Sequence, residues 1–240
     1  MKKFYFLAMF SLLTILFGQE KLVVNYHFTY DYNTEGITDQ KIKDFIKETN
    51  ETTGEYTLIT TKNESSFSKV QKINNSQSSN SQYGMSAPSR DIYTNMDENY
   101  YLEFIDFMGK SIIVKDSLKT FKWVIEKEKS KILGYEVRKA VFRKDKMTYE
   151  AWYAPQLAYR NGPNNMAGLP GLILKLTEIS PSKNGLNKTH YVATAVTIDE
   201  TAKINKPSKG EIMSYNEYQK ILEDFFKKAK DNPNVERIEL

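Results

Sequence analysis

Apolar residues recur at every second position along most of the chain, and many of them are β-branched or aromatic. This alternation is typical of half-buried β-strands. We expect a hairpin at residues 108–110 and a polar turn at 144–146. The pattern predicts strands over residues 22–30, 56–61, 66–73, 100–107, 111–114, 121–126, 132–143, 148–153, 172–178 and 190–198.

Two regions break the alternation. Residues 76–90 are rich in Ser, Asn and Gln and almost free of apolar side chains, which predicts a mobile loop. Residues 214–230 carry apolar side chains at helical spacing, and Ser214 followed by Glu217 has the signature of a capping box. The second region therefore predicts an amphipathic helix. Residues 34–54 suit either a short helix or an exposed, charged insert.

Many short strands with little helix indicate a mainly β fold. A single flat sheet would leave one apolar face in water, so we expect the antiparallel sheet to curl into a half-barrel or to stack as a sandwich. The C-terminal amphipathic helix is expected to pack on this sheet. Residues 20–240 are expected to form one β-rich domain, and no internal repeat is visible.

The N-terminal residues have the layout of a signal peptide. Lys2 and Lys3 precede an apolar run over residues 4–17, which ends at Gly18 and Gln19. A run of this length with a basic head favours a cleaved leader at 1–19 over an uncleaved membrane anchor, because a spanning helix needs about 20 apolar residues. No later segment is long and apolar enough to span a bilayer. The expected location is the periplasm or the exterior.

The whole chain contains no cysteine, so it offers no disulfide, no thiol nucleophile and no lipidated cysteine of the kind that anchors bacterial lipoproteins. Burial alone must stabilise the fold. The net charge of +4 results from 34 basic and 30 acidic residues spread along the chain. This even distribution argues against a nucleic-acid partner.

The most distinctive stretch lies between residues 149 and 174. Trp152 and Tyr153 place large rings on opposite faces of a strand, and Gly162-Pro163 then marks a turn. Pro170-Gly171 suits a type II turn that leads into an apolar strand. The residues to which we assign a structural role are Gly134, Tyr135, Gly162, Pro163, Gly168, Leu169, Pro170, Gly171, Leu172 and Ile173.

The hexapeptide at 168–173 resembles the motif that names the GLPGLI proteins of Bacteroidota. The resemblance extends upstream through Trp123, the Gly134-Tyr135 pair, Lys139-Ala140 and Trp152. It implies a secreted or periplasmic, β-rich protein of a family without an established enzymatic activity. Members often carry a cysteine shortly after the Gly-Tyr pair, where this chain has Val137 and Arg138, which excludes a thiol-dependent role here.

Residue types that carry common enzyme chemistry are scarce. Only His27 and His190 are present, and both lie in strand patterns where an ordinary sheet residue is expected. The sequence contains no phosphate loop, no Gly-x-Ser-x-Gly elbow and no zinc-ligand spacing. We therefore expect no cofactor and no metal. An envelope hydrolase that uses paired carboxylates on a glycan-like substrate is kept as the alternative function.

A binding or accessory role suits the composition better, because the chain has 16 Tyr and 13 Phe. A curled sheet has a concave face, and aromatic rings bind apolar or sugar-like ligands at little entropic cost. Many of these rings are expected to fill the core instead, among them Phe121, Trp123, Tyr135 and Trp152. We predict that the loop after Trp152 borders a ligand pocket or partner surface formed by Trp152, Tyr153, Arg160, Asn164 and Asn165.

The identity of the ligand or partner in the envelope is left open by the sequence. Ser117 lies in Asp116-Ser117-Leu118, which resembles a short O-glycan attachment site of exported proteins. An intact mass above that of the polypeptide would be the mark of such a modification.

Overall fold

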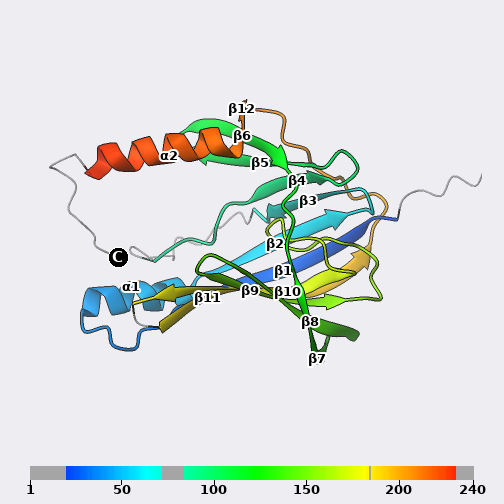
Figure 1. The fold of residues 1–240 in the computed structure, drawn as a ribbon, viewed down its shortest axis with the longest axis horizontal. Helices are drawn as coiled ribbons and strands as arrows, with labels where there is room; N and C mark the ends of the chain where they lie inside the picture. The colour runs from blue at the N-terminus through cyan, green and yellow to red at the C-terminus, as the bar shows by residue number, and fades with distance from the viewer. Residues whose placement is uncertain (1–19, 72–83, 184, 231–240) are drawn as a thin grey trace, which may run out of the picture.

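The computed structural model describes residues 20–71, 84–183 and 185–230 (Figure 1). The predicted signal peptide at 1–19 and residues 76–83 of the predicted loop lie outside the described residues. The described chain forms β1 (Leu22–Asp31), α1 (Gln40–Glu51), β2 (Thr53–Thr60), β3 (Glu64–Lys69), β4 (Asp91–Asn95), β5 (Tyr100–Phe107), β6 (Lys110–Ser117), β7 (Val124–Ile132), β8 (Tyr135–Lys144), β9 (Met147–Ala154), β10 (Leu172–Ser182), β11 (Gly185–Ile198), β12 (Glu211–Met213) and α2 (Tyr215–Lys230).

The strands of the described residues form one sheet in the order β12-β6-β5-β4-β3-β2-β1-β11-β10-β9-β8-β7. Neighbours pair antiparallel except β12 and β6, which run parallel. The sheet curves strongly but does not close (Figure 1). The prediction of a mainly β, curled sheet with a C-terminal helix is confirmed, in its half-barrel rather than its sandwich form.

The main core lies on one face of the sheet, which we call the inner face. Strand register aligns Leu58, Phe67 and Ile92 along one row of this face. The Phe67 ring of this row stacks on the ring of Tyr56 with centroids 5.3 Å apart, and Tyr191 meets both edge-on. Full burial of each such ring contributes on the order of 2 kcal/mol, so much of the high aromatic content stabilises the core.

Helices α1 and α2 contact different strands of the sheet, α1 contacting β1 and α2 contacting β6. α1 connects β1 to β2, and its first turn is capped by Asp39, whose carboxylate accepts hydrogen bonds from the backbone of Lys41 and Ile42. Helix α2 packs on the inner face of β5 and β6 through Tyr218 and Ile221. The ambiguous stretch at 34–54 thus contains a helix.

The predicted capping box of α2 is formed. The Glu217 backbone N–H donates to Ser214 Oγ at 3.2 Å, and the Glu217 carboxylate accepts the Ser214 N–H at 2.7 Å. This reciprocal pair satisfies donors that the first helical turn would otherwise leave without partners.

Strand boundaries between 121 and 144 differ from the prediction. The first strand of this region begins at Val124 rather than residue 121 and continues to Ile132, and a turn at Leu133-Gly134 separates it from β8. β7 is exposed on both faces and is rich in Lys and Glu, so it lacks the apolar alternation on which the prediction depended. Strands β4 and β12, of five and three residues, were also missed.

Candidate functional site

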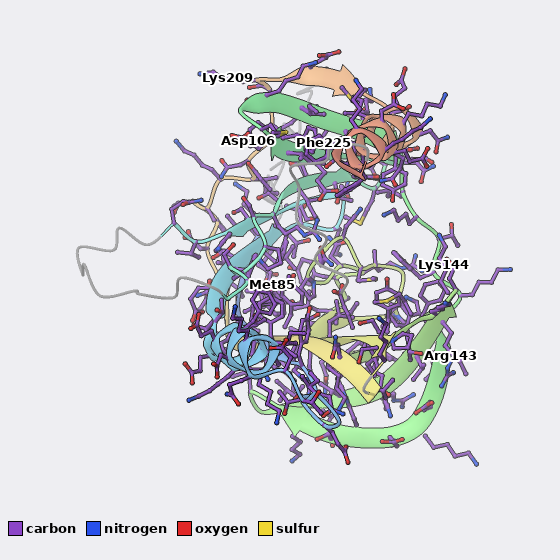
Figure 2. All side chains as sticks on the ribbon, turned by 90° about the vertical axis from the view of Figure 1, so that its left-hand side faces the viewer. Met85, Asp106, Arg143, Lys144, Lys209 and Phe225 are labelled. Carbon is purple, nitrogen blue, oxygen red and sulfur yellow. The ribbon has the colours of Figure 1, made fainter. Side chains whose placement is uncertain are left out.

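Two segments of the described chain lie on the inner face of the sheet, and the first of them borders a cleft. One is α2, above β5 and β6; the other is the chain between β9 and β10, residues 155–171, which we call the inner segment. The Asn161 side chain donates to Thr60 Oγ1 at 2.7 Å, and Thr94 Oγ1 donates to Asn165 Oδ1 at 3.4 Å. These bonds hold the inner segment across β2 and β4, within the curve of the sheet (Figure 2).

The cleft lies between the first turns of α2 and the inner face of β5 and β6. Its volume is about 350 Å³, which is within the range of small-molecule sites. Tyrosine rings, two aliphatic side chains and several polar groups form its walls. The lining residues are Ser89, Arg90, Glu103, Phe104, Ile105, Asp106, Val114, Tyr215, Tyr218 and Gln219.

Arg90 and Glu103 form the charged centre of this cleft, which we call the Arg90–Glu103 cleft. Arg90 Nη1 lies 2.7 Å from Glu103 Oε1, and the two side chains are 35% and 18% exposed. Arg90 Nε is buried and has no hydrogen-bond partner among the described residues. A buried donor without a partner is costly, so Glu103 alone does not satisfy the Arg90 guanidinium group.

Strand register explains why a carboxylate stands at this position. Glu103 of β5 pairs with Ile92 on one side and Val114 on the other, so it shares the inner-face row that begins with Leu58 and Phe67. An ionised group in a row of apolar side chains needs a partner. Arg90, one residue before β4, supplies it.

The charge of Arg90 interacts with several ionisable groups besides Glu103 and shifts the pKa of nearby tyrosines. Burial by itself would lower the pKa of Arg90, but Glu103, Tyr191 and Glu178 raise it above its ordinary value. Burial raises the pKa of Tyr30 to about 12, and Arg90 partly opposes this shift. Arg90 therefore stays charged and lies at the junction between the α2 side of the inner face and the tyrosine-rich core.

Tyr218 contributes a neutral phenol to the same site. Burial and the nearby carboxylate of Glu103 raise its pKa, while Arg90 opposes the increase. The phenol is therefore protonated at neutral pH and can donate a hydrogen bond.

The segment before Arg90 is fixed to the sheet by tyrosine hydroxyls. Tyr30 Oη donates to the Ser86 carbonyl at 3.0 Å, and Tyr56 Oη donates to the Pro88 carbonyl at 2.5 Å. Residues 84–90 were predicted as part of a loop, and they have no regular secondary structure. Their hydrogen bonds nevertheless hold Arg90 in a defined position.

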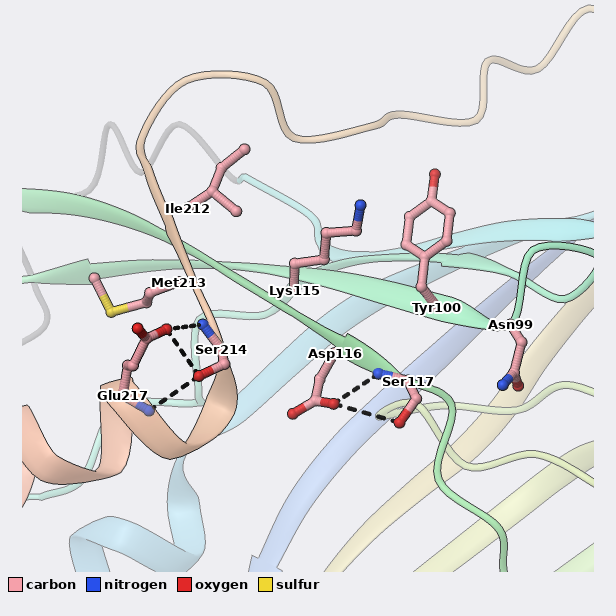
Figure 3. A pocket seen from close by; sticks show the side chains of 9 residues that line it. All are labelled: Asn99, Tyr100, Lys115, Asp116, Ser117, Ile212, Met213, Ser214 and Glu217. Carbon is pink, nitrogen blue, oxygen red and sulfur yellow. Dashed lines mark hydrogen bonds between the residues drawn. The ribbon is translucent and has the colours of Figure 1, made fainter.

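A second hollow, of about 470 Å³, lies where β12 leaves the sheet and α2 begins (Figure 3). Asp116 accepts hydrogen bonds from the backbone and hydroxyl of Ser117, and Glu217 accepts them from Ser214. The carboxylates in this hollow are thus used by neighbouring groups of the chain. We regard the Arg90–Glu103 cleft as the better candidate, because it has a buried donor without a partner.

The five residues predicted from sequence to bind a ligand lie apart from this cleft. Tyr153 is 1% exposed and belongs to the core. Trp152 lies between Lys139 and Lys175 in the strand register and is partly buried against the main core cluster. Arg160 is exposed.

Asn164 and Asn165 both have left-handed backbone angles, with φ of 53° and 58°. Asn164 Nδ2 donates to Glu178 Oε1 at 2.6 Å, and Asn165 accepts from Thr94. These amides connect the inner segment to the sheet. The structure therefore does not bring the five predicted residues together in one hollow.

The motif around residues 162–173 is packed inside the half-barrel. Leu169, Leu172 and Ile173 are buried, and Tyr26 Oη donates to the Ile173 carbonyl at 2.6 Å. Gly162 and Pro163 are also buried, Gly168 and Pro170 are exposed, and Tyr135 contacts the core from the hairpin turn at Gly134.

The turn at Pro170 is tighter than the predicted type II turn. The Gly171 N–H donates to the Leu169 carbonyl at 2.9 Å, while the Leu172 N–H donates to Leu157 instead. Gly171 has φ of 153°, far from the value near 80° that a type II turn requires. The turn thus closes over three residues, and the strand that follows starts at Leu172, as predicted.

Several other ionisable groups of the described residues have partners on the outer face. Lys139 lies 3.5 Å from Glu126, 3.5 Å from Glu128 and 3.7 Å from Glu150. His27 contacts Glu55 at 2.8 Å, and Thr177 contacts His190 at 3.0 Å. Burial and Lys175 lower the pKa of His190, against the opposing effect of Asp31. Among the described residues, no group of three or more His, Asp or Glu side chains is placed to hold a metal ion.

Comparison with known proteins places the chain in a family. Residues 47–217 match the family described as "N-glycanase peptide, N-terminal domain", which is more than two thirds of the chain. The chain belongs to this family. The matched range contains most of the sheet and the start of α2, and therefore eight of the ten residues of the Arg90–Glu103 cleft; Tyr218 and Gln219 lie just beyond it.

Two solved structures support the same fold for this member of the N-glycanase peptide N-terminal domain family. PNGF-II in a C2 crystal has 20% sequence identity and a TM-score of 0.55 over 85% of this chain. PNGF-II in a P21 crystal has 18% identity and a TM-score of 0.56 over 84%. The chain spans about a third of the length of these PNGF-II chains, 32% and 33%. No curated protein matches the chain at a significant level.

Sequence reasoning missed Arg90, Glu103 and Tyr218 as site residues. Arg90 lies in a region of low apolar content that predicted only a loop. The sequence did contain a sign of Glu103. Strand alternation places it on the same face as Tyr101, Ile105 and Phe107, where the other side chains are apolar. A carboxylate at an inward position indicates a charge partner, but only the fold could identify that partner as Arg90.

Proposed function

We propose that this chain is an exported, non-enzymatic binding protein of the bacterial envelope, and that its ligand or partner occupies the Arg90–Glu103 cleft. The observation that carries the proposal is the buried Arg90 Nε, a donor without a partner, beside a carboxylate in an aromatic-lined hollow. The pair offers a donor and an acceptor side by side, which favours recognition of a polar ligand.

The family supports an accessory role. Its description refers to an N-terminal domain of an N-glycanase peptide, and the solved PNGF-II chains are about three times as long as the aligned region. A domain of this kind can bind a substrate or partner for an activity located elsewhere. We include in the proposal the resemblance to the GLPGLI proteins, with export by the leader at 1–19 and no lipid anchor. Within the described residues, no helix has the length and apolar character to cross a membrane.

The alternative, an envelope hydrolase that uses paired carboxylates, has less support in the described residues, because the two carboxylates that share a hollow, Asp116 and Glu217, already accept hydrogen bonds from Ser117 and Ser214. The three carboxylates that come together, Glu126, Glu128 and Glu150, surround the ammonium group of Lys139 on the outer face. They serve as its counter-ions. In the cleft itself, Glu103 is paired with Arg90, so the arrangement suits binding better than proton transfer.

Native mass spectrometry of the protein purified from its own periplasm or culture medium tests the proposal. We expect a retained ligand or partner that is lost in the double variant Arg90→Met/Glu103→Gln, which removes both charges together and so avoids leaving one ion without its partner. The matched control is Lys139→Met/Glu150→Gln on the outer face, which should retain the ligand. Loss of the ligand in Trp152→Ala, with retention in the Arg90/Glu103 double variant, would contradict the proposed site.

A further inference from the structure

The charge balance of the Arg90–Glu103 cleft restricts the class of ligand that it can accept. Arg90 and Glu103 neutralise each other at 2.7 Å, and Asp106 adds a negative charge to the lining. An anionic ligand would meet two carboxylates, and it would have to compete with Glu103 for the guanidinium group. A cationic ligand would have to displace Arg90 from Glu103. Either exchange leaves a desolvated charge without its partner, which is strongly unfavourable.

A neutral ligand with adjacent hydroxyl groups matches the pair without breaking it. A hydroxyl is both a donor and an acceptor, so one hydroxyl can accept from the guanidinium group of Arg90, whose side chain is 35% exposed, while its neighbour donates to Glu103. Hydrogen bonds to ionised partners are the stronger ones. Gln219 and Ser89 add further polar groups at the border of the cleft.

The walls of the cleft suit the flat, weakly polar faces of a sugar ring. Tyr215 and Tyr218 face the hollow from the first turns of α2, while Ile105 and Val114 line it from the sheet. Tyr215 is 39% exposed, so its ring is available at the opening of the cleft. Aromatic rings provide rigid contact area at a low entropic cost.

We infer that the Arg90–Glu103 cleft binds a neutral sugar residue through adjacent hydroxyl groups, with Tyr215 against a face of the ring. This inference rests on the proposed function and specifies its ligand.

The experiment compares sugars that differ in charge on the full chain. The probes are trimers of glucose, galactose and N-acetylglucosamine, which are neutral, the cationic glucosamine trimer and the anionic galacturonate trimer. Saturation-transfer NMR detects binding, and calorimetry measures the dissociation constant. We expect at least one neutral trimer to bind at least tenfold more tightly than either charged trimer.

Variants locate the binding. The double variant Arg90→Met/Glu103→Gln and the single variant Tyr215→Ala should each raise the dissociation constant at least tenfold, whereas Tyr215→Phe should change it less than threefold. The outer-face control Lys139→Met/Glu150→Gln should leave it unchanged. Thermal unfolding of each variant identifies any loss of folded protein, and Tyr215→Phe retains the ring if Tyr215→Ala destabilises α2.

Three outcomes would overturn the inference: tighter binding of a charged trimer, neutral binding that the Arg90/Glu103 variant does not weaken, or no binding of any trimer. Native mass spectrometry separates this failure from that of the proposed function. A non-sugar ligand that is retained by the wild type and lost in Arg90→Met/Glu103→Gln would reject the sugar and leave the binding role intact. No retained ligand and no trimer binding would reject both.

Discussion

Gly162 and Gly171 lie within the inner segment, and each position excludes a side chain for a steric reason. A Cβ at Gly162 would lie 2.7 Å from Ile173 Cβ, and a Cβ at Gly171 would lie 2.3 Å from the Ala154 carbonyl oxygen. Gly168 differs, because its φ is +91° but nothing lies within 4 Å of a Cβ there. Gly162 and Gly171 are therefore required for close packing, whereas Gly168 is required only for its left-handed backbone conformation.

Alanine substitutions should separate these two causes. Gly168→Ala should cost about 1 kcal/mol of the free energy of unfolding, from backbone strain. Gly162→Ala and Gly171→Ala should cost about 3 kcal/mol or more, because overpacking against the core adds to any strain. Urea denaturation of the three variants measures the difference. An equal cost at all three positions would show that conformation, rather than packing, explains the glycines.

The sequence made the motif visible at the residue scale but not its role. Pro170-Gly171 correctly predicted a turn into an apolar strand, and Trp152 and Tyr153 lie on opposite faces as strand alternation requires. Gly171 closely approaches Ala154, a residue 17 positions earlier in the chain. No local signal encodes that distance, so the turn type was mistaken.

At the scale of elements, Lys139 organises the outer edge of the sheet. The register between β7 and β8 shifts between Ile125 and Lys129, so Glu126 and Glu128 both lie near Lys139, and Glu150 of β9 completes the set. β7 is exposed on both faces, so apolar burial contributes little to its position. The ion pairs with Lys139 thus help to set its register.

The pH dependence of this cluster follows from its charges. Burial lowers the pKa of Lys139, but Glu150, Glu128 and Glu126 together raise it above its ordinary value. A basic group with a raised pKa contributes stability that is complete below its unfolded-state pKa and is lost as pH rises through the folded value. The contribution of Lys139 is therefore present at neutral pH and disappears above about pH 10.5.

Lys139→Met should reduce the free energy of unfolding by about 1 kcal/mol at pH 7, because these partly exposed pairs are screened by solvent. The loss should shrink above about pH 10.5, where Lys139 itself loses its charge as pH passes its folded-state pKa. Urea denaturation at pH 7 and pH 11 measures both values. Lys127→Met, at an exposed position on β7, is the control. A loss that is independent of pH would contradict the electrostatic explanation.

At the scale of the whole molecule, one sheet connects three apolar clusters. The largest contains the inner face of β1, β2, β10 and β11. A second lies between α2 and the inner face of β5 and β6, and a third lies on the opposite face of β4 to β6 against Ile204. The Arg90–Glu103 cleft borders the first two clusters, so its geometry depends on both.

Because strands β2 to β5 join these clusters through continuous hydrogen-bonded ladders, we expect the chain to unfold in a single transition. Leu174→Ala in the first cluster and Ile112→Ala in the second should each lower the stability of that one transition by about 2–5 kcal/mol. Differential scanning calorimetry checks this by comparing the calorimetric with the van't Hoff enthalpy. Two transitions, each sensitive to one variant, would indicate that the halves of the sheet unfold separately.

The local alternation of apolar and polar residues was sufficient to determine a mainly β chain, most of its strands and the capped helix α2, because these features depend on neighbours within a few positions. Tertiary structure decided that the twelve strands of the described residues form one open sheet, that the inner segment lies within its curve, and that Arg90 meets Glu103. Each of these features depends on contacts between residues distant in sequence or on the order of strands. Such contacts form only after the sheet has assembled, so the candidate site lies in the part of the molecule that local patterns do not encode.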